Sequence, residues 1–175
     1  MTCLRMKGRV WKYGDRIPND GGLLSRKYEK LQIYDPRELA KWCLEDIDPR
    51  FANEVEPGDI VVAGKRFGEG NHHIQGFLAL KGAGVGVVVE SIPRGALRSC
   101  IHAGVPILPS CPGVTATIDG GSEIEVDFET GEVIDRSAGR SFRFEPLPAD
   151  LLRIIKAGGA PAYIRDTMLA KTSPS

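Results

Sequence analysis

The run Ile60-Val61-Val62-Ala63, followed by Gly64-Lys65-Arg66-Phe67-Gly68-Glu69-Gly70-Asn71, decides the fold. Four consecutive apolar residues without alternation are typical of a strand that is buried on both faces, as in a parallel sheet covered by helices. The glycine-rich loop then gives way to the helical spacing of Ile74, Phe77 and Leu78. A strand that passes through a loop into a helix is the first half of a β-α-β unit.

Two further apolar runs complete this unit. Residues 84–89 and the shorter segment 105–108 have the composition of buried strands. The helix predicted between them has a proline at its start, one apolar stripe and a glycine at its end, namely Pro93, Leu97, Cys100, Ile101 and Gly104. We therefore expect an α/β fold with a parallel β-α-β-α-β core.

Another helix is predicted ahead of this core, over residues 35–48. Asp35 can cap its N-terminus, and Pro36 suits the first helical position. Asp48-Pro49 ends the pattern, because proline cannot continue a helix.

The C-terminal third changes from buried runs to alternating ones. Residues 123–134 contain two alternating segments around the hairpin turn Thr130-Gly131, and residues 141–144 alternate again. These patterns predict an antiparallel β layer beside the parallel core. Apolar residues at helical spacing over 151–155 predict a last helix, which stops at Gly158-Gly159.

Length and composition narrow the class of protein. The chain has 175 residues, 42% of them hydrophobic, with 23 basic and 23 acidic side chains. We expect one domain over residues 1–170 and a disordered tail over 171–175. The balanced charge argues against nucleic-acid binding, and no apolar run approaches the roughly 20 residues that span a membrane. The N-terminus lacks the apolar segment of a secretory signal, and the four cysteines form no C-x-x-C pair. These features favour a cytoplasmic protein with reduced thiols.

The glycine-rich loop is the most informative place for chemistry. Gly68 and Gly70 allow a tight turn, and the free N–H groups of the predicted helix behind them favour a carboxylate or a phosphate. A nucleotide site is not indicated, because no Gly-Lys-Ser/Thr ends the loop and His73 occupies the third glycine position of G-x-G-x-x-G.

Asn71, His72 and His73 lie where this helix is predicted to begin. Asn71 suits a simple N-cap, with both histidines on the surface. In the functional interpretation, one histidine acts as an acid or base near neutral pH and the other binds an anion. Two adjacent histidines of a helix cannot both point at one ion, so no metal site is expected. A second polar cluster, residues 13–20 followed by Arg26, is either a solvated turn or the source of an arginine clamp for a carboxylate.

The order of these motifs resembles the family of 3-isopropylmalate dehydratase small subunits, the swivel domain of the aconitase superfamily. Residues 8–15 are similar to the start of the family, and residues 15–20 resemble its D-x-I-x-T-D element. The similarity continues through the strand and loop at 57–70. It also includes the segment Glu90, Ser91, Arg94, Arg98, Gly104 and Pro106, and the C-terminal elements 124–127, Gly131, 144–146 and 157–159. The resemblance covers nearly the whole chain and implies the swivelling β/β/α fold.

The resemblance implies a heterodimeric hydro-lyase of the kind used in leucine biosynthesis. A large partner subunit would carry a [4Fe-4S] cluster, and one open iron of that cluster would act as a Lewis acid toward a hydroxy acid. The small subunit closes over the site and contributes a serine base and an arginine that binds carboxylate, so this chain itself would hold no cofactor and would be active only with the large subunit. The residues expected to bind substrate are Asp20, Arg26, Gly70, Asn71 and Arg94.

The chain departs from the family at its signature. G-S-S-R-E-H is replaced by Gly70-Asn71-His72-His73-Ile74-Gln75, so Asn71 matches the serine and His73 matches the arginine. Asn19 likewise replaces the threonine of D-x-I-x-T-D. Because an amide is no general base, three outcomes remain open. His72 or His73 serves as the catalytic base for another hydroxy acid, or the partner supplies all proton transfer, or the chain is a catalytically silent paralogue that binds or regulates the large subunit.

Overall fold

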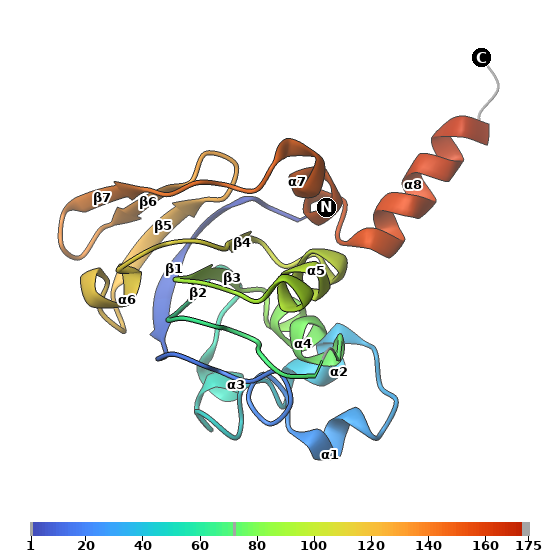
Figure 1. Ribbon diagram of the computed structural model, residues 1–175, viewed down its shortest axis with the longest axis horizontal. Coiled ribbons are helices and arrows are strands. Elements are labelled where there is room, and N and C mark those ends of the chain that lie inside the picture. Colours follow the sequence, from blue (N-terminus) through green and yellow to red (C-terminus); the bar gives the residue numbers. More distant parts are fainter. Residues whose placement is uncertain (1, 72, 173–175) are drawn as a thin grey trace.

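The computed structural model describes residues 2–71 and 73–172, in which seven strands form one mixed sheet with the order β4-β3-β2-β1-β5-β6-β7 (Figure 1). The strands are β1 (Arg5–Lys12), β2 (Ile60–Ala63), β3 (Gly86–Val89), β4 (Ile107–Leu108), β5 (Glu123–Asp127), β6 (Glu132–Asp135) and β7 (Arg140–Arg143). The helices are α1 (Arg26–Glu29), α2 (Pro36–Ala40), α3 (Phe51–Glu54), α4 (Gln75–Ala83), α5 (Arg94–Ala103), α6 (Val114–Thr117), α7 (Ala149–Lys156) and α8 (Ala160–Thr172). The α/β fold class is confirmed.

The parallel half of the sheet matches the prediction. β1 to β4 run parallel, and α4 and α5 connect the strands of the core. Every residue of β2 and β3 is buried, which explains their unbroken apolar sequences. The helix α4 packs against α2 and α5 (Figure 1). Both α4 and α5 end at a left-handed glycine, Gly84 and Gly104.

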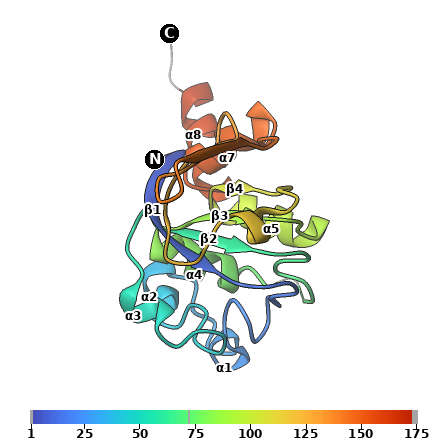
Figure 2. The same cartoon turned by 90° about the vertical axis from the view of Figure 1, so that its left-hand side faces the viewer.

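The sequence patterns did not reveal the central strand, β1. It pairs parallel with β2 and antiparallel with β5, so the antiparallel strands continue the same sheet, which curls around this junction (Figures 1 and 2). β1 lacks the apolar pattern of a buried strand because it carries several basic residues. These residues lie on an exposed face and pair with acidic residues of the neighbouring strand β5. Arg5 lies 2.6 Å from Glu125, and Lys7 lies 3.2 Å from Glu123.

Two helix predictions need correction. Asp35 does accept a hydrogen bond from the backbone N–H of Arg37 (2.9 Å), but the helix ends at Ala40 and turns follow. Leu44 in these turns has a left-handed backbone (φ 57°), which a helix cannot contain.

The helix predicted over residues 151–155 is α7, which ends at Lys156, just before Gly158-Gly159, as predicted; it is not the last helix, because α8 follows these glycines. The helix α8 buries none of its residues and projects from the body of the protein (Figure 1). It includes residues 171 and 172 of the predicted tail, and the rest of that tail, 173–175, lies outside the described residues. No helix in the described part of the chain is long and apolar enough to cross a membrane.

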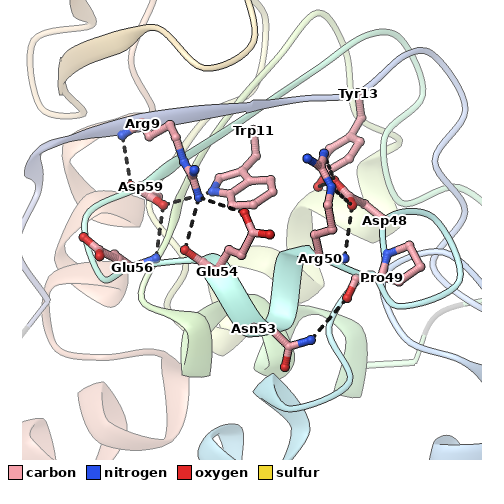
Figure 3. Close-up of polar contacts among 10 residues, drawn as sticks. All are labelled: Arg9, Trp11, Tyr13, Asp48, Pro49, Arg50, Asn53, Glu54, Glu56 and Asp59. Carbon is pink, nitrogen blue, oxygen red and sulfur yellow. Dashed lines mark hydrogen bonds and ion pairs between the residues drawn. The ribbon is translucent and has the colours of Figure 1, made fainter.

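Asp59 attaches the turn before β2 to β1 (Figure 3). Its side chain accepts hydrogen bonds from the backbone N–H of Arg9 (2.9 Å), the indole N–H of Trp11 (2.9 Å) and the backbone N–H of Glu56 (3.1 Å). Asp59 is 5% exposed, so these donors have little access to water as a substitute. One carboxylate thus fixes how the central strand meets the parallel core.

We expect Asp59→Ala to lower the free energy of unfolding by about 3 kcal/mol, because it leaves several donors without a partner in a buried place. Urea denaturation measures this difference. Asp119→Ala, at an exposed position, is the matched control and should change the free energy by less than about 0.5 kcal/mol. Equal effects of the two substitutions would contradict the role given to Asp59.

Candidate functional site

The candidate site forms where the β1–β2 pair continues past the ends of its strands. The backbone segments that follow β1 and β2 remain side by side and exchange a series of hydrogen bonds. These bonds link Tyr13 to Val62, Gly64 to Gly14, Arg16 to Lys65, Gly68 to Ile17, and Asn19 to Glu69, with N···O distances of 2.7–3.0 Å. This extended pairing brings Asp20 beside Asn71 and His73, although the two segments are far apart in the sequence.

Charged side chains stiffen the two segments. Arg16 and Arg66 both adopt left-handed backbone conformations (φ 59°), and the two guanidinium groups bind the same carboxylate, Glu69, at 2.9 and 2.6 Å. The side chain of Asp15 accepts a hydrogen bond from the backbone N–H of Lys65 (2.7 Å). A side chain at Gly64 would collide with that Asp15 carboxylate, which explains the glycine at this position.

Asn19 holds the turn that precedes α4. Its side chain is buried, and its amide N–H groups donate to the backbone carbonyls of Asn71 (2.9 Å) and His73 (2.7 Å). Gly76 leaves the space for this arrangement, because an added Cβ there would collide with the Asn19 amide oxygen and lie 2.8 Å from Cβ of Leu23. The asparagine at this position is therefore a brace for the candidate site.

Two carboxylates and an imidazole meet in front of this turn. The Oδ1 atom of Asp20 lies 2.7 Å from Nδ1 of His73, and its Oδ2 atom accepts a hydrogen bond from the Asn71 amide (2.9 Å). The Oε2 atom of Glu29 lies 3.4 Å from the same Nδ1 atom. The side chains of Asp20 and Glu29 are 7% and 8% exposed, whereas that of His73 is 47% exposed.

These contacts change the proton affinities of all three groups. Burial, together with the neighbouring Asp20 carboxylate, raises the pKa of Glu29 to about 7. Burial alone would raise the pKa of Asp20, but hydrogen bonds from His73 and Asn71 outweigh it and lower that pKa. The hydrogen bond to Asp20 raises the pKa of His73 and favours its imidazolium form.

The short helix α1 supplies the other side of the site. Arg26 and Glu29 lie three residues apart, so they share one face of the helical turn. Tyr28 on the same helix stacks on Trp42, with ring centroids 4.2 Å apart, and this contact fixes the helix against the turns that follow α2. The resulting cavity of about 380 Å³ is lined by Asp20, Arg26, Glu29, Lys30, Gln32, Asn71 and His73.

Four of the predicted site residues, Asp20, Arg26, Asn71 and His73, meet in this cavity. Gly70 precedes Asn71 and does not line the cavity; its left-handed backbone (φ 97°) suits glycine. Arg94 lies elsewhere, at the start of α5, in a separate cavity of about 340 Å³ between α5 and α7. His72 is outside the described residues.

Asn71 is not the N-cap of the following helix. α4 begins at Gln75 with Ile74 before it, and the Asn71 side chain binds Asp20 instead. The cavity is accordingly lined by side chains that precede α4 and not by N–H groups of its first turn. Sequence reasoning missed Glu29; its position three residues after Arg26 was the available signal.

The cysteines do not gather into a ligand set. Cys43, Cys100 and Cys111 are buried, and burial raises the pKa of each thiol, while Cys3 is exposed. Within the part of the chain that the structure describes, Asp20, Glu29 and His73 form the one group of three His, Cys, Asp or Glu residues that are close enough to share an ion.

Comparisons with known proteins place the chain in a family, although no protein-family model matches it. It is 38% identical over 164 residues to the isopropylmalate/citramalate isomerase small subunit of Methanocaldococcus jannaschii, covering 93% of this chain and 95% of that protein. It is 43% identical to the 3-isopropylmalate dehydratase small subunit of Halothermothrix orenii (89% and 93% covered). It is also 39% identical to the 2,3-dimethylmalate dehydratase small subunit of Eubacterium barkeri (94% and 99% covered).

A solved structure agrees with these relatives. The crystal structure of 3-isopropylmalate dehydratase (leuD) from Methanocaldococcus jannaschii superposes with a TM-score of 0.87 at 29% identity, covering 96% of this chain and 98% of that one. Sequence and fold agree over nearly the full length. The chain therefore belongs to the family of 3-isopropylmalate dehydratase small subunits.

Proposed function

We propose that this chain is the substrate-binding small subunit of a two-subunit hydro-lyase that acts on an alkyl-substituted malate. Isopropylmalate, citramalate and dimethylmalate, the compounds in the names of its relatives, share a malate skeleton and differ in their alkyl groups. A dicarboxylate of this kind needs fixed cationic groups at one carboxylate. The proposed compartment is the cytoplasm, whose reducing conditions suit the four unpaired cysteines of the chain.

The observation that carries the proposal is the convergence of Arg26 and His73 on one cavity. Arg26 is exposed, and its side chain makes no hydrogen bond or ion pair within the described chain, so its planar guanidinium is available to a carboxylate. The Nδ1 atom of His73 faces Asp20 and Glu29, which leaves Nε2 as its free nitrogen. In the imidazolium form, Nε2–H donates a hydrogen bond to the substrate carboxylate.

This assignment separates the roles of the two histidines. His73, at the position that matches the arginine of the family, serves as the carboxylate-binding cation. His72, its neighbour in the sequence, is then the proposed acid or base that moves a proton at the carbon next to the bound carboxylate. Asn71 has a positioning role, because its amide donates to Asp20 and thereby orients the carboxylate that holds His73.

The large subunit completes the proposed enzyme. Its [4Fe-4S] cluster would supply Lewis-acid chemistry at the substrate hydroxyl, as the family resemblance implies. The cysteines of this chain do not fit such a cluster, because three of them are buried apart from any shared ligand group among the described residues. This chain binds and orients the carboxylate and shields the reacting carbon from water.

Activity should require both subunits. We expect the purified chain to show no turnover of alkylmalates, and its co-expression with the large subunit to produce a complex that forms the alkene, measured by ultraviolet absorbance. A complex that forms but dehydrates no alkylmalate would support the silent paralogue instead. Turnover by the single chain would contradict the two-subunit assignment.

Substitution of each histidine should separate binding from proton transfer. We expect His73→Ala to raise KM by roughly 10- to 100-fold with a smaller change in kcat, because it removes a charge-assisted hydrogen bond. His72→Ala should lower kcat by roughly 100-fold or more. His102→Ala, in the separate cavity beside α5, is the control. Unchanged kinetics in both variants would assign this chemistry to the partner.

Arg26 should be sensitive even to a conservative change. We expect Arg26→Lys to raise KM by roughly tenfold, because an ammonium keeps the charge but loses the paired N–H donors that match a carboxylate. Steady-state kinetics of the reconstituted complex measure this effect, with Lys27→Arg on the same helix as the control. An Arg26→Lys enzyme with normal KM would exclude a bidentate contact.

A further inference from the structure

We infer that Asp20, Glu29 and His73 form a binding site for a divalent cation of the first transition row. The site belongs to the cavity described above. Its donor geometry is independent of the hydro-lyase assignment, whereas its role toward substrate rests on the proposed function.

The donors come from three separate segments and converge on one point. One ligand atom from each residue lies within 4.8 Å of the other two, and the Nδ1 atom of His73 is 2.7 Å from Asp20 and 3.4 Å from Glu29. One imidazole with two carboxylates is a donor set that suits Mn²⁺, Fe²⁺ and Zn²⁺. From the sequence, only the adjacent pair His72–His73 was considered as a metal site, and two adjacent histidines of a helix cannot share an ion. The sequence does not show that Asp20 and Glu29 approach His73.

Glu29 provides a second and independent observation. Its side chain is 8% exposed, and its Oε1 atom is buried without a hydrogen-bond partner within the described chain. A buried polar atom without a partner is unfavourable, and in native proteins it calls for an explanation such as an ion. A cation held between the two carboxylates would coordinate Glu29 and remove that cost.

The charges in the cavity favour the same conclusion. Asp20 and Glu29 are two acidic groups in a place that is proposed to receive a third carboxylate from the substrate. Arg26 and a protonated His73 supply two positive charges against these three negative ones. A divalent ion that replaces the proton on Nδ1 would balance the charge, and its remaining coordination positions would be open to the substrate carboxylate. His73 would then be a neutral imidazole that still presents Nε2–H to the cavity, and the ion would supply the positive charge that the proposed function gives to the imidazolium.

The competing occupant is a proton shared between Asp20 and Glu29. Such a proton would also relieve the repulsion between the two carboxylates. The two occupants differ in one measurable respect, because only the cation site binds added metal with a defined stoichiometry.

Mn²⁺ titration of the tag-free chain tests the inference. The chain should carry Cys3→Ser, because the exposed Cys3 thiol is a competing ligand. Electron paramagnetic resonance of free Mn²⁺ should reveal one saturable site. Glu29→Gln and Asp20→Asn should each weaken binding by roughly tenfold or more, whereas Glu129→Gln, at an exposed position near Lys156, should leave it unchanged.

Circular dichroism establishes whether each variant is folded. His73→Ala provides a further test if a carboxylate variant does not fold, because this side chain is about half exposed and its removal should weaken binding without unfolding the chain. Absence of saturable binding at millimolar Mn²⁺, or equal affinity in Glu29→Gln and Glu129→Gln, would overturn the site and favour the shared proton. Saturable binding in a chain whose complex dehydrates no alkylmalate would retain the metal site and reject the proposed function.

Discussion

The parallel pairing of β1 with β2 is the constraint on which the rest of the molecule depends. Within the sheet it joins the buried parallel strands to the antiparallel hairpins through one central strand. Beyond the sheet it continues as backbone hydrogen bonds between two loops, as far as Asn19 and Glu69. The site is therefore an extension of the ladder, and its precision comes from backbone geometry more than from the flexible side chains that line it.

Asn19 shows how this geometry is transmitted to the chemistry. It is the last residue of the first loop to join the ladder, and its side chain reaches across to two carbonyls of the second loop. The next residue, Asp20, orients His73. Two neighbouring residues thus act on the same loop: Asn19 holds its backbone, and Asp20 holds the side chain of His73. The resemblance implies threonine at the first of these positions, so Asn19 would accompany the replacement of serine and arginine that the same resemblance implies in the opposite loop.

The sequence predicted those parts of the fold that have an unambiguous apolar period. The unbroken runs of β2 and β3 and the stripes of α4 and α5 were recognisable, because burial on one or two faces leaves a regular pattern. β1 was hidden because its exposed face carries arginine and lysine, whose pairing with β5 is a tertiary property. In the site, Asp20, Arg26 and His73 were predicted from motif positions, and the structure places them in one cavity. Glu29 could not be found in this way, because tertiary contacts set where α1 lies: Tyr28 stacks on Trp42, and Lys27 and Tyr28 bind Glu45.

The projecting helix α8 has a consequence for the dynamics of the chain. A helix of 13 residues that buries no side chain gains little from its contacts with α5 and α7 and depends mainly on its local hydrogen bonds, and isolated helices of this length are marginal in water. Its unwinding exposes almost no additional apolar surface, so it can proceed while the sheet stays intact. The backbone amides of α8 should then exchange with solvent through local fraying, on a timescale separate from that of the strands. We therefore expect the sheet and the helices packed on it to unfold cooperatively, and α8 to unwind independently of them.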